Sequence, residues 1–210
     1  AHSIRAVPLV LTPPDLQDQT CDIGRIARAL AMPKYPTCSL SLLQEIPGLL
    51  RRNSFRITAI VAGDELMGIE PWFDTPRLLG RAVDIGTTTI AGALVNLTTG
   101  EALAIAGRSN PQGIRGDDVV TRIDYARRGK KERDELQRLV VETIGEILRE
   151  TCAAVDTEPA RVYQISAAGN TTMHHLLLGL DPAAIAESPF VAALRWGHST
   201  RARHVGLGAG

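Results

Sequence analysis

RAVDIGTTTIAGALVNLTTGEALAIAG, residues 81–107, is the segment that indicates the fold most clearly. It contains three apolar segments, at residues 81–85, 89–97 and 101–107, and turn residues separate them. Short apolar runs bounded by turns are typical of β-strands joined as a meander. Because the segments are apolar almost throughout, we expect both faces of their sheet to be covered.

The residues that follow extend this meander into an α/β fold. A polar loop leads to the helical segment 117–128, and a longer helix is predicted over 131–155 because its apolar residues fall on one stripe. A buried strand is predicted at 161–169, followed by a helix that ends near Gly179. The order is β-β-β-α-α-β-α, which predicts one mixed sheet with the long helix on one face.

Residues 1–80 are predicted to form a separate small α+β domain, so that the second domain covers 81–210. The segment DIGRIARAL has helical character, and SLSLLQEIPGLL predicts a second helix that bends or ends near Pro47. FRITAIVAGDELMGIEP predicts a hairpin with its turn at Gly63-Asp64.

Composition excludes several functional classes. Lys and Arg total 23 and Asp and Glu total 23, so no overall field favours nucleic acid or an anionic membrane surface. From these residues we expect no signal peptide, and no apolar run among them reaches membrane-spanning length. Its three cysteines are far apart, which favours reduced thiols in a cytoplasmic protein and gives no metal-ligand spacing.

The first turn of the meander combines residue types that suit a phosphate and a metal. Gly86 lets backbone N–H groups approach an anion, and Thr87, Thr88 and Thr89 add hydroxyl donors. Asp84, near the end of the first strand, suits Mg²⁺ bound through water. The alternative is an ordinary hairpin whose threonines simply favour strands.

Three segments resemble a known family. AVDIGTTTIAGALVNLTTG is similar to the first phosphate loop of the superfamily of actin, sugar kinases and heat-shock chaperones, called ASKHA. NPQGIRGDDVVTRI and ISAAGNTTMHHLLLGLDP resemble one branch of it, the reductive activators of corrinoid proteins. LTPPDLQDQTCDIGRIARAL resembles the middle domain of those activators.

This resemblance implies an incomplete ribonuclease-H-like, actin-like lobe that binds ATP and Mg²⁺. It implies an intact enzyme that uses ATP to restore a corrinoid partner to the cobalt(I) state, with an electron from a 2Fe-2S cluster. A homodimer is compatible with this interpretation. The alternative is a nucleotide-binding or dimerisation module, or a metabolite kinase of the same superfamily.

The sequence departs from the family pattern in two respects. Cys21, Cys38 and Cys152 do not supply the four thiolates of an iron–sulfur cluster. The second lobe of an actin-like fold is also missing. We therefore interpret the chain as an internal fragment that binds ATP weakly and catalyses nothing by itself.

Further cleft candidates follow the predicted strand 161–169. The resemblance to sugar kinases suggests that Gly169, Asn170, Thr171 and Thr172 face the nucleotide, whereas the alternative for Asn and Thr is helix capping. Asp118 matches the family pattern but also suits a helix N-terminus. The sequence assigns no catalytic residue.

Overall fold

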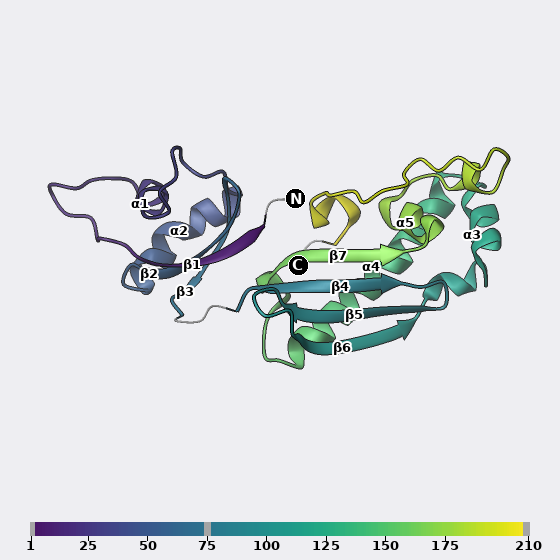
Figure 1. Cartoon of the computed structure of the whole chain (residues 1–210), viewed down its shortest axis with the longest axis horizontal. Helices are drawn as coiled ribbons and strands as arrows, with labels where there is room; N and C mark the ends of the chain where they lie inside the picture. The colour runs from purple at the N-terminus through teal and green to yellow at the C-terminus, as the bar shows by residue number, and fades with distance from the viewer. Residues whose placement is uncertain (1–2, 74–76, 208–210) are drawn as a thin grey trace. The chain divides into compact units, whose positions relative to one another are not determined.

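The computed structural model describes residues 3–73 and 77–207, which fold as a mixed α/β protein (Figure 1). The chain forms two compact units, one ending at Leu78 and the other beginning at Leu79. Each unit has its own β-sheet and apolar core, so the predicted hairpin and the predicted meander lie in separate sheets. Across the described ranges, every helix is too short or too polar for a bilayer crossing.

The first unit is an antiparallel sheet of order β1-β2-β3, packed against two helices. Its elements are β1 (Ile4–Val10), α1 (Asp22–Ala29), α2 (Leu40–Arg52), β2 (Arg56–Ala62) and β3 (Glu65–Pro71). Alternate strand residues meet the apolar faces of both helices. The buried residues of this core are Leu9, Leu11, Ile26, Ile46, Leu50, Phe55, Ile57, Ala59, Val61, Leu66 and Ile69.

Two features of this unit differ from the sequence predictions. β1 is absent from those predictions, and it tolerates Pro8 because it is an edge strand whose one partner is β2. α2, for which the sequence predicts a bend or an end near Pro47, does not end there and continues to Arg52. Pro47 is exposed, so the carbonyl group that loses its N–H partner can bond to water, while Ile46 and Leu50 anchor the helix in the core.

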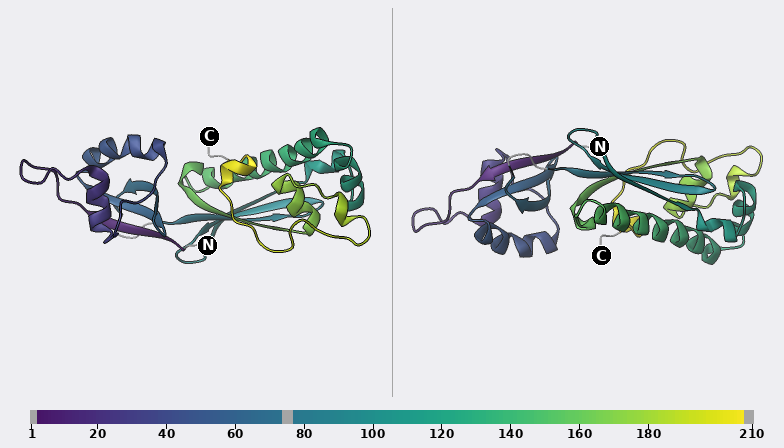
Figure 2. Two further views of the ribbon diagram at one scale, coloured as in Figure 1. Left: turned by 90° about the horizontal axis from the view of Figure 1, so that it is seen from above. Right: turned by 90° about the horizontal axis from the view of Figure 1, so that it is seen from below.

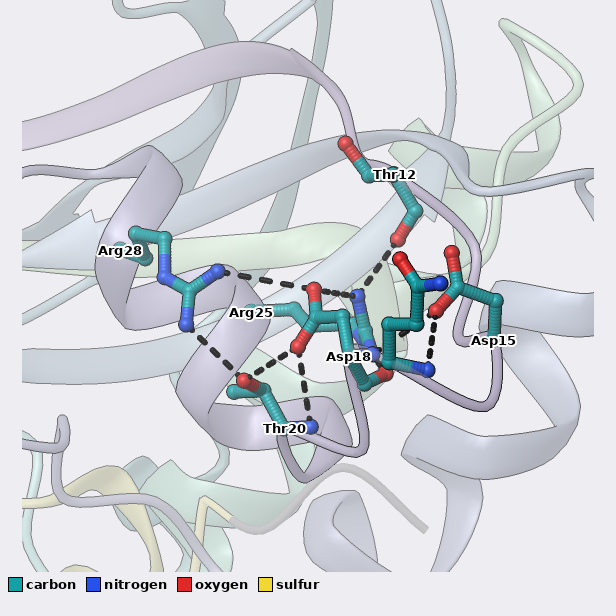
Figure 3. Close-up of polar contacts among 7 residues, drawn as sticks. Thr12, Asp15, Asp18, Thr20, Arg25 and Arg28 are labelled. Atoms are coloured by element: carbon teal, nitrogen blue, oxygen red, sulfur yellow. Dashed lines mark hydrogen bonds and ion pairs between the residues drawn. The ribbon is translucent and has the colours of Figure 1, made fainter.

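A buried arginine organises the loop before α1 (Figure 3). The Arg25 guanidinium donates to the Thr12 carbonyl oxygen at 2.9 Å and to the Asp18 carboxylate at 2.8 Å. The Thr20 hydroxyl donates to Asp18 Oδ1 at 2.6 Å. The hydrogen bonds from Thr20, together with the Arg25 charge, lower the pKa of Asp18 to about 2. The conformation of this loop therefore depends on an ionised carboxylate.

The second unit is built on a mixed four-stranded sheet of order β6-β5-β4-β7 (Figure 1). Its main elements are β4 (Leu79–Ile85), β5 (Thr89–Asn96), β6 (Ala102–Ser109), α3 (Val119–Ala126), α4 (Lys130–Ala153), β7 (Val162–Gly169) and α5 (Thr171–Leu178). β4, β5 and β6 form an antiparallel meander, and β7 runs parallel to β4. The predicted order β-β-β-α-α-β-α is confirmed.

The long helix α4 covers one face of this sheet (Figure 2). Its apolar residues, spaced three and four apart, pack against alternate residues of β4 and β5, and α5 contributes to the same core. The buried residues of this core are Val83, Ile85, Ile90, Ala126, Leu136, Val140, Ile144, Ile147, Met173, Leu176 and Leu177.

The opposite face of the sheet is exposed within the described residues, so the prediction that both faces are covered is wrong for this structure. Ile105 is 73% exposed, and Ala82, Ser166 and Ala168 on the same face are exposed as well. In β4 and β5, large buried side chains alternate with less buried residues such as Ala82 and Ala91, and this alternation is hard to recognise in an alanine-rich sequence. β7, predicted to be buried, is an edge strand in which half-buried residues alternate with exposed ones from Tyr163 to Ala168.

Candidate functional site

The turn between β4 and β5 contains the predicted phosphate-binding residues. The Gly86 N–H group donates to the Thr89 carbonyl oxygen at 2.9 Å and closes the turn. A Cβ atom at Gly86 would lie 2.6 Å from the same oxygen, which is too close for any side chain. Glycine at position 86 is therefore needed to close the turn. The sequence prediction gave it a different role, which is to let a phosphate approach the backbone. Thr88 and Thr89 are exposed, and Thr87 is half-buried.

Three consecutive carbonyl groups of this turn bond to groups on its inner side. The Asn110 side-chain amide donates to the Gly86 oxygen at 2.9 Å, and the Asn110 backbone N–H donates to the Thr88 oxygen at 2.7 Å. Between them, Arg122 Nη2 donates to the Thr87 oxygen at 2.6 Å. Asn110 follows β6 and Arg122 lies on α3, so segments distant in the sequence hold the turn.

Gln112 connects this support to the rest of the core. It is fully buried, and its Oε1 accepts a hydrogen bond from Arg122 Nη1 at 3.2 Å. Its Nε2 donates to the Leu136 carbonyl oxygen of α4 at 2.9 Å. Arg122 Nε donates in addition to the Gly116 oxygen at 2.8 Å. The turn is thereby joined to α3 and α4 through buried hydrogen bonds, which are costly to break.

The inward carbonyl groups determine the direction of the amide groups. In a trans peptide, the C=O and the following N–H point in opposite directions. Because the oxygens of Gly86, Thr87 and Thr88 point inward, the N–H groups of Thr87, Thr88 and Thr89 point outward. Successive N–H groups that point the same way form a concave nest for an anion.

The N-terminus of α5 lies beside this turn. The Asn170 side chain accepts a hydrogen bond from the Met173 N–H at 2.9 Å and caps the helix. Its Nδ2 donates to the Thr87 hydroxyl at 3.3 Å, so one side chain both caps α5 and contacts the turn. Gly169 pairs with Ile85, and a Cβ atom there would lie 3.0 Å from the Ile85 oxygen. Close approach of β4 and β7 therefore brings Asn170 to the turn.

Asp84 lies on the exposed face of the sheet, two residues before Gly86. Its neighbours across the strands are Ala91 and Ala168, whose small side chains leave the carboxylate accessible. Mg²⁺ retains several water ligands and takes one or two carboxylates with substrate phosphates, so one carboxylate here fits it. Within residues 3–73 and 77–207, no group of three or more His, Cys, Asp or Glu could hold a metal by itself.

The other cleft candidates have contacts that stabilise the fold. The Asp118 carboxylate caps α3 by accepting a hydrogen bond from the Thr121 N–H at 2.8 Å. Hydrogen bonds from Thr121 lower the pKa of Asp118. Thr172 is 2% exposed and belongs to the interior, whereas Thr171 is exposed.

The cysteines do not form a cluster site. Cys21 is exposed and Cys38 is half-buried in the first unit, while Cys152 is buried in the second. All three are free thiols. Since an iron–sulfur cluster takes four thiolate ligands, these residues do not fit one, and we assign no electron-transfer step to them.

Sequence reasoning did not identify Asn110, Gln112 or Arg122 as site residues. All three lie in NPQGIRGDDVVTRI, residues 110–123, which carries part of the family resemblance. The sequence contains one indication that Arg122 is buried. Arg122 lies four residues before the buried Ala126, so both residues are on the inner face of α3. A charged residue on such a face needs buried partners.

Comparison with known proteins connects this arrangement to a family. The profile of the RACo linker region matches residues 1–76, and that of the RACo middle region matches residues 79–210. The corrinoid activation enzyme RamQ of Eubacterium limosum is 34% identical over 137 residues, which are 65% of this chain and 23% of RamQ.

A solved structure shows the same fold. The protein described as a reductive activator for corrinoid, iron-sulfur protein matches with a TM-score of 0.76 and 29% sequence identity. The match covers 98% of this chain and 34% of the solved chain. The chain thus spans a minor part of the length of both relatives.

Proposed function

The chain belongs to the RACo family, and from this premise we propose that it supplies the first phosphate-binding turn of an ATP-dependent corrinoid activator. One observation carries the proposal: three carbonyl groups of the β4–β5 turn are held inward, so that successive N–H groups point outward. Donors that are fixed before the ligand arrives bind an anion without a further cost of reorganisation.

In this proposal, each residue of the turn has a distinct role. Gly86 permits the tight closure, and the N–H groups of Thr87, Thr88 and Thr89 donate to phosphate oxygens, with their hydroxyl groups as further donors. Asp84 holds metal-bound water at the edge of the site. When Mg²⁺ is bound with the nucleotide, it neutralises part of the negative charge of the phosphates.

We assign the mixed sheet of the second unit to the first part of an actin-like ATPase lobe. Its support is the strand order β6-β5-β4-β7, with an antiparallel meander followed by a parallel strand. The adenosine contacts and the closing of the cleft come from another part of the protein in this proposal. Residues 79–210 alone would then bind ATP weakly, because the phosphates remain in contact with water.

The proposed reaction of the intact protein is the ATP-driven return of a corrinoid partner to the cobalt(I) state in the cytoplasm. This state has a very low potential, so transfer of an electron to cobalt must be coupled to a conformation that ATP favours. The names of the two relatives support a corrinoid partner. The 2Fe-2S cluster of this scheme requires ligands outside the present chain.

The substitution Asp84→Asn in the intact protein tests the site. We expect Mg-dependent ATP turnover to fall at least about tenfold, because a lost contact with a charged group costs about 1.5–3 kcal/mol. The absorbance of the cobalt(I) corrinoid should form correspondingly more slowly. The matched control is Asp134→Asn, which removes only an exposed pair with Lys130 on α4.

Normal ATP hydrolysis by Asp84→Asn would show that the metal assignment is wrong. ATP turnover that depends on a small phosphoryl acceptor, and not on a corrinoid protein, would instead identify a metabolite kinase.

A further inference from the structure

A buried positive charge lies behind the proposed phosphate turn. Arg122 is 1% exposed, and all of its hydrogen-bond acceptors are neutral atoms of Thr87, Gly116, Gln112 and Met173. Within the described parts of the chain, Arg122 forms no salt bridge with any carboxylate. A guanidinium stays protonated in proteins, so its charge is present in the core.

Nearby acids compensate this charge only weakly. Burial lowers the pKa of Arg122, and the opposing effects of Asp117 and Asp118 are smaller. The Asp118 carboxylate already accepts hydrogen bonds from the Thr121 N–H and hydroxyl groups at 2.8 and 2.9 Å. A buried charge without an ionic partner is unfavourable, which points to a ligand that completes its environment.

One peptide group connects this charge to the outer side of the turn. Arg122 Nη2 donates to the Thr87 carbonyl oxygen, and the N–H on the opposite side of that peptide belongs to Thr88. The guanidinium polarises the peptide, so the Thr88 N–H becomes a stronger donor. An anion at this N–H therefore interacts with the peptide dipole and with the charge behind it.

Building on the proposed function, we infer that Arg122 is a positioning residue that orients this turn and attracts a polyphosphate to it. The ligand class is a chain of two or more phosphates, because each added negative charge strengthens the attraction. Adenosine carries no phosphate, so Arg122 does not increase its binding affinity.

The test measures binding of MgATP, inorganic tripolyphosphate and adenosine to the intact protein by calorimetry. We expect Arg122→Gln to weaken MgATP and tripolyphosphate binding by about tenfold to hundredfold and to leave adenosine binding unchanged. Arg122→Lys keeps the charge and should recover part of the lost affinity. The matched control is Arg115→Gln, which removes an ion pair with Glu135 and a cation–π contact with Tyr125 and should bind all three ligands normally.

The outcomes separate this inference from the proposed function. If wild-type protein binds tripolyphosphate and a folded Arg122→Gln variant binds it equally well, the role of Arg122 is refuted. An equal loss of adenosine binding would also refute it, because a general distortion would then explain both losses. If wild-type protein binds adenosine but no tripolyphosphate, the phosphate turn itself is wrong, and the inference is overturned with it.

A second variant applies if Arg122→Gln does not fold. Gln112→Glu retains Arg122 and puts a carboxylate where the Gln112 Oε1 now accepts its hydrogen bond at 3.2 Å, and it gives up the hydrogen bond from Gln112 Nε2 to the Leu136 carbonyl oxygen. Neutralising the guanidinium in this way should weaken tripolyphosphate binding about tenfold. Unchanged binding by this variant would overturn the inference.

Discussion

The substitution Gly86→Ala tests the construction of the phosphate turn, and Gly113→Ala is its matched control. A Cβ atom at position 86 would lie 2.6 Å from the Thr89 carbonyl oxygen, which belongs to the backbone and cannot rotate away. The turn must therefore open, and the hydrogen bond from Gly86 to Thr89, now 2.9 Å long, is lost or lengthened. At Gly113, no atom lies within 4 Å of an added Cβ.

The size of the effect follows from three contributions. Overpacking costs about 1–3 kcal/mol. Loss of a hydrogen bond costs about 0.5–1.5 kcal/mol. Alanine restricts the unfolded chain and returns about 0.4–1 kcal/mol. We therefore expect Gly86→Ala to lower the free energy of unfolding by about 2 kcal/mol, and Gly113→Ala to change it by less than about 0.5 kcal/mol.

Urea unfolding followed by circular dichroism measures both variants. A loss of about 2 kcal/mol also corresponds to a fall in Tm of about 4–8 °C for a chain of this size. Gly86→Ala should in addition weaken MgATP binding, because opening the turn moves the Thr87 and Thr88 carbonyl groups away from Arg122 and Asn110. Equal stability of the two variants would refute the claim that closure of the turn requires glycine at position 86.

Two further predictions concern other parts of the chain. The pKa of Asp18 is lowered from 3.8 to about 2, so its stabilisation of the first unit is complete above about pH 4 and is lost as the pH falls through about 2. Asp18→Asn should therefore remove this acid dependence in thermal unfolding, and an unchanged pH profile would contradict the Arg25–Asp18–Thr20 network. Asn170→Ala should cost about 0.5–2 kcal/mol through loss of the α5 cap, and Asn170→Ser should restore most of it. Equal stability of the alanine and serine variants in urea unfolding would argue against the cap.

Local patterns predicted most of the secondary structure of the second unit. The three strands of the meander, the long amphipathic helix and the helix that ends at Gly179 all form near the predicted residues. Gly179 has a φ of 69°, in the left-handed region that favours glycine at the C-terminus of a helix. These features depend on spacing and backbone preference over a few residues, which a sequence displays directly.

Two prolines lie inside regular elements because the surroundings of those elements override local preference. Pro8 lies in a strand because that strand is at the edge of its sheet, and Pro47 lies within a helix because its side faces water. The exposed sheet face was not predicted, since alanine is compatible with both buried and exposed positions.

The order of strands and helices in the second unit and the position of the glycine turn can be read from local patterns, because both follow from contacts between near neighbours. Only the tertiary structure identified the support of that turn. Arg122 reaches Thr87 across 35 positions of the chain, and Asn110 reaches Gly86 across 24. In the sequence, an arginine in a short helix resembles a solvated surface residue. In the folded chain, Arg122 is buried behind the three inward carbonyl groups of the turn. The sequence does not show this burial, because the hydrogen-bond partners of Arg122 come from separate elements.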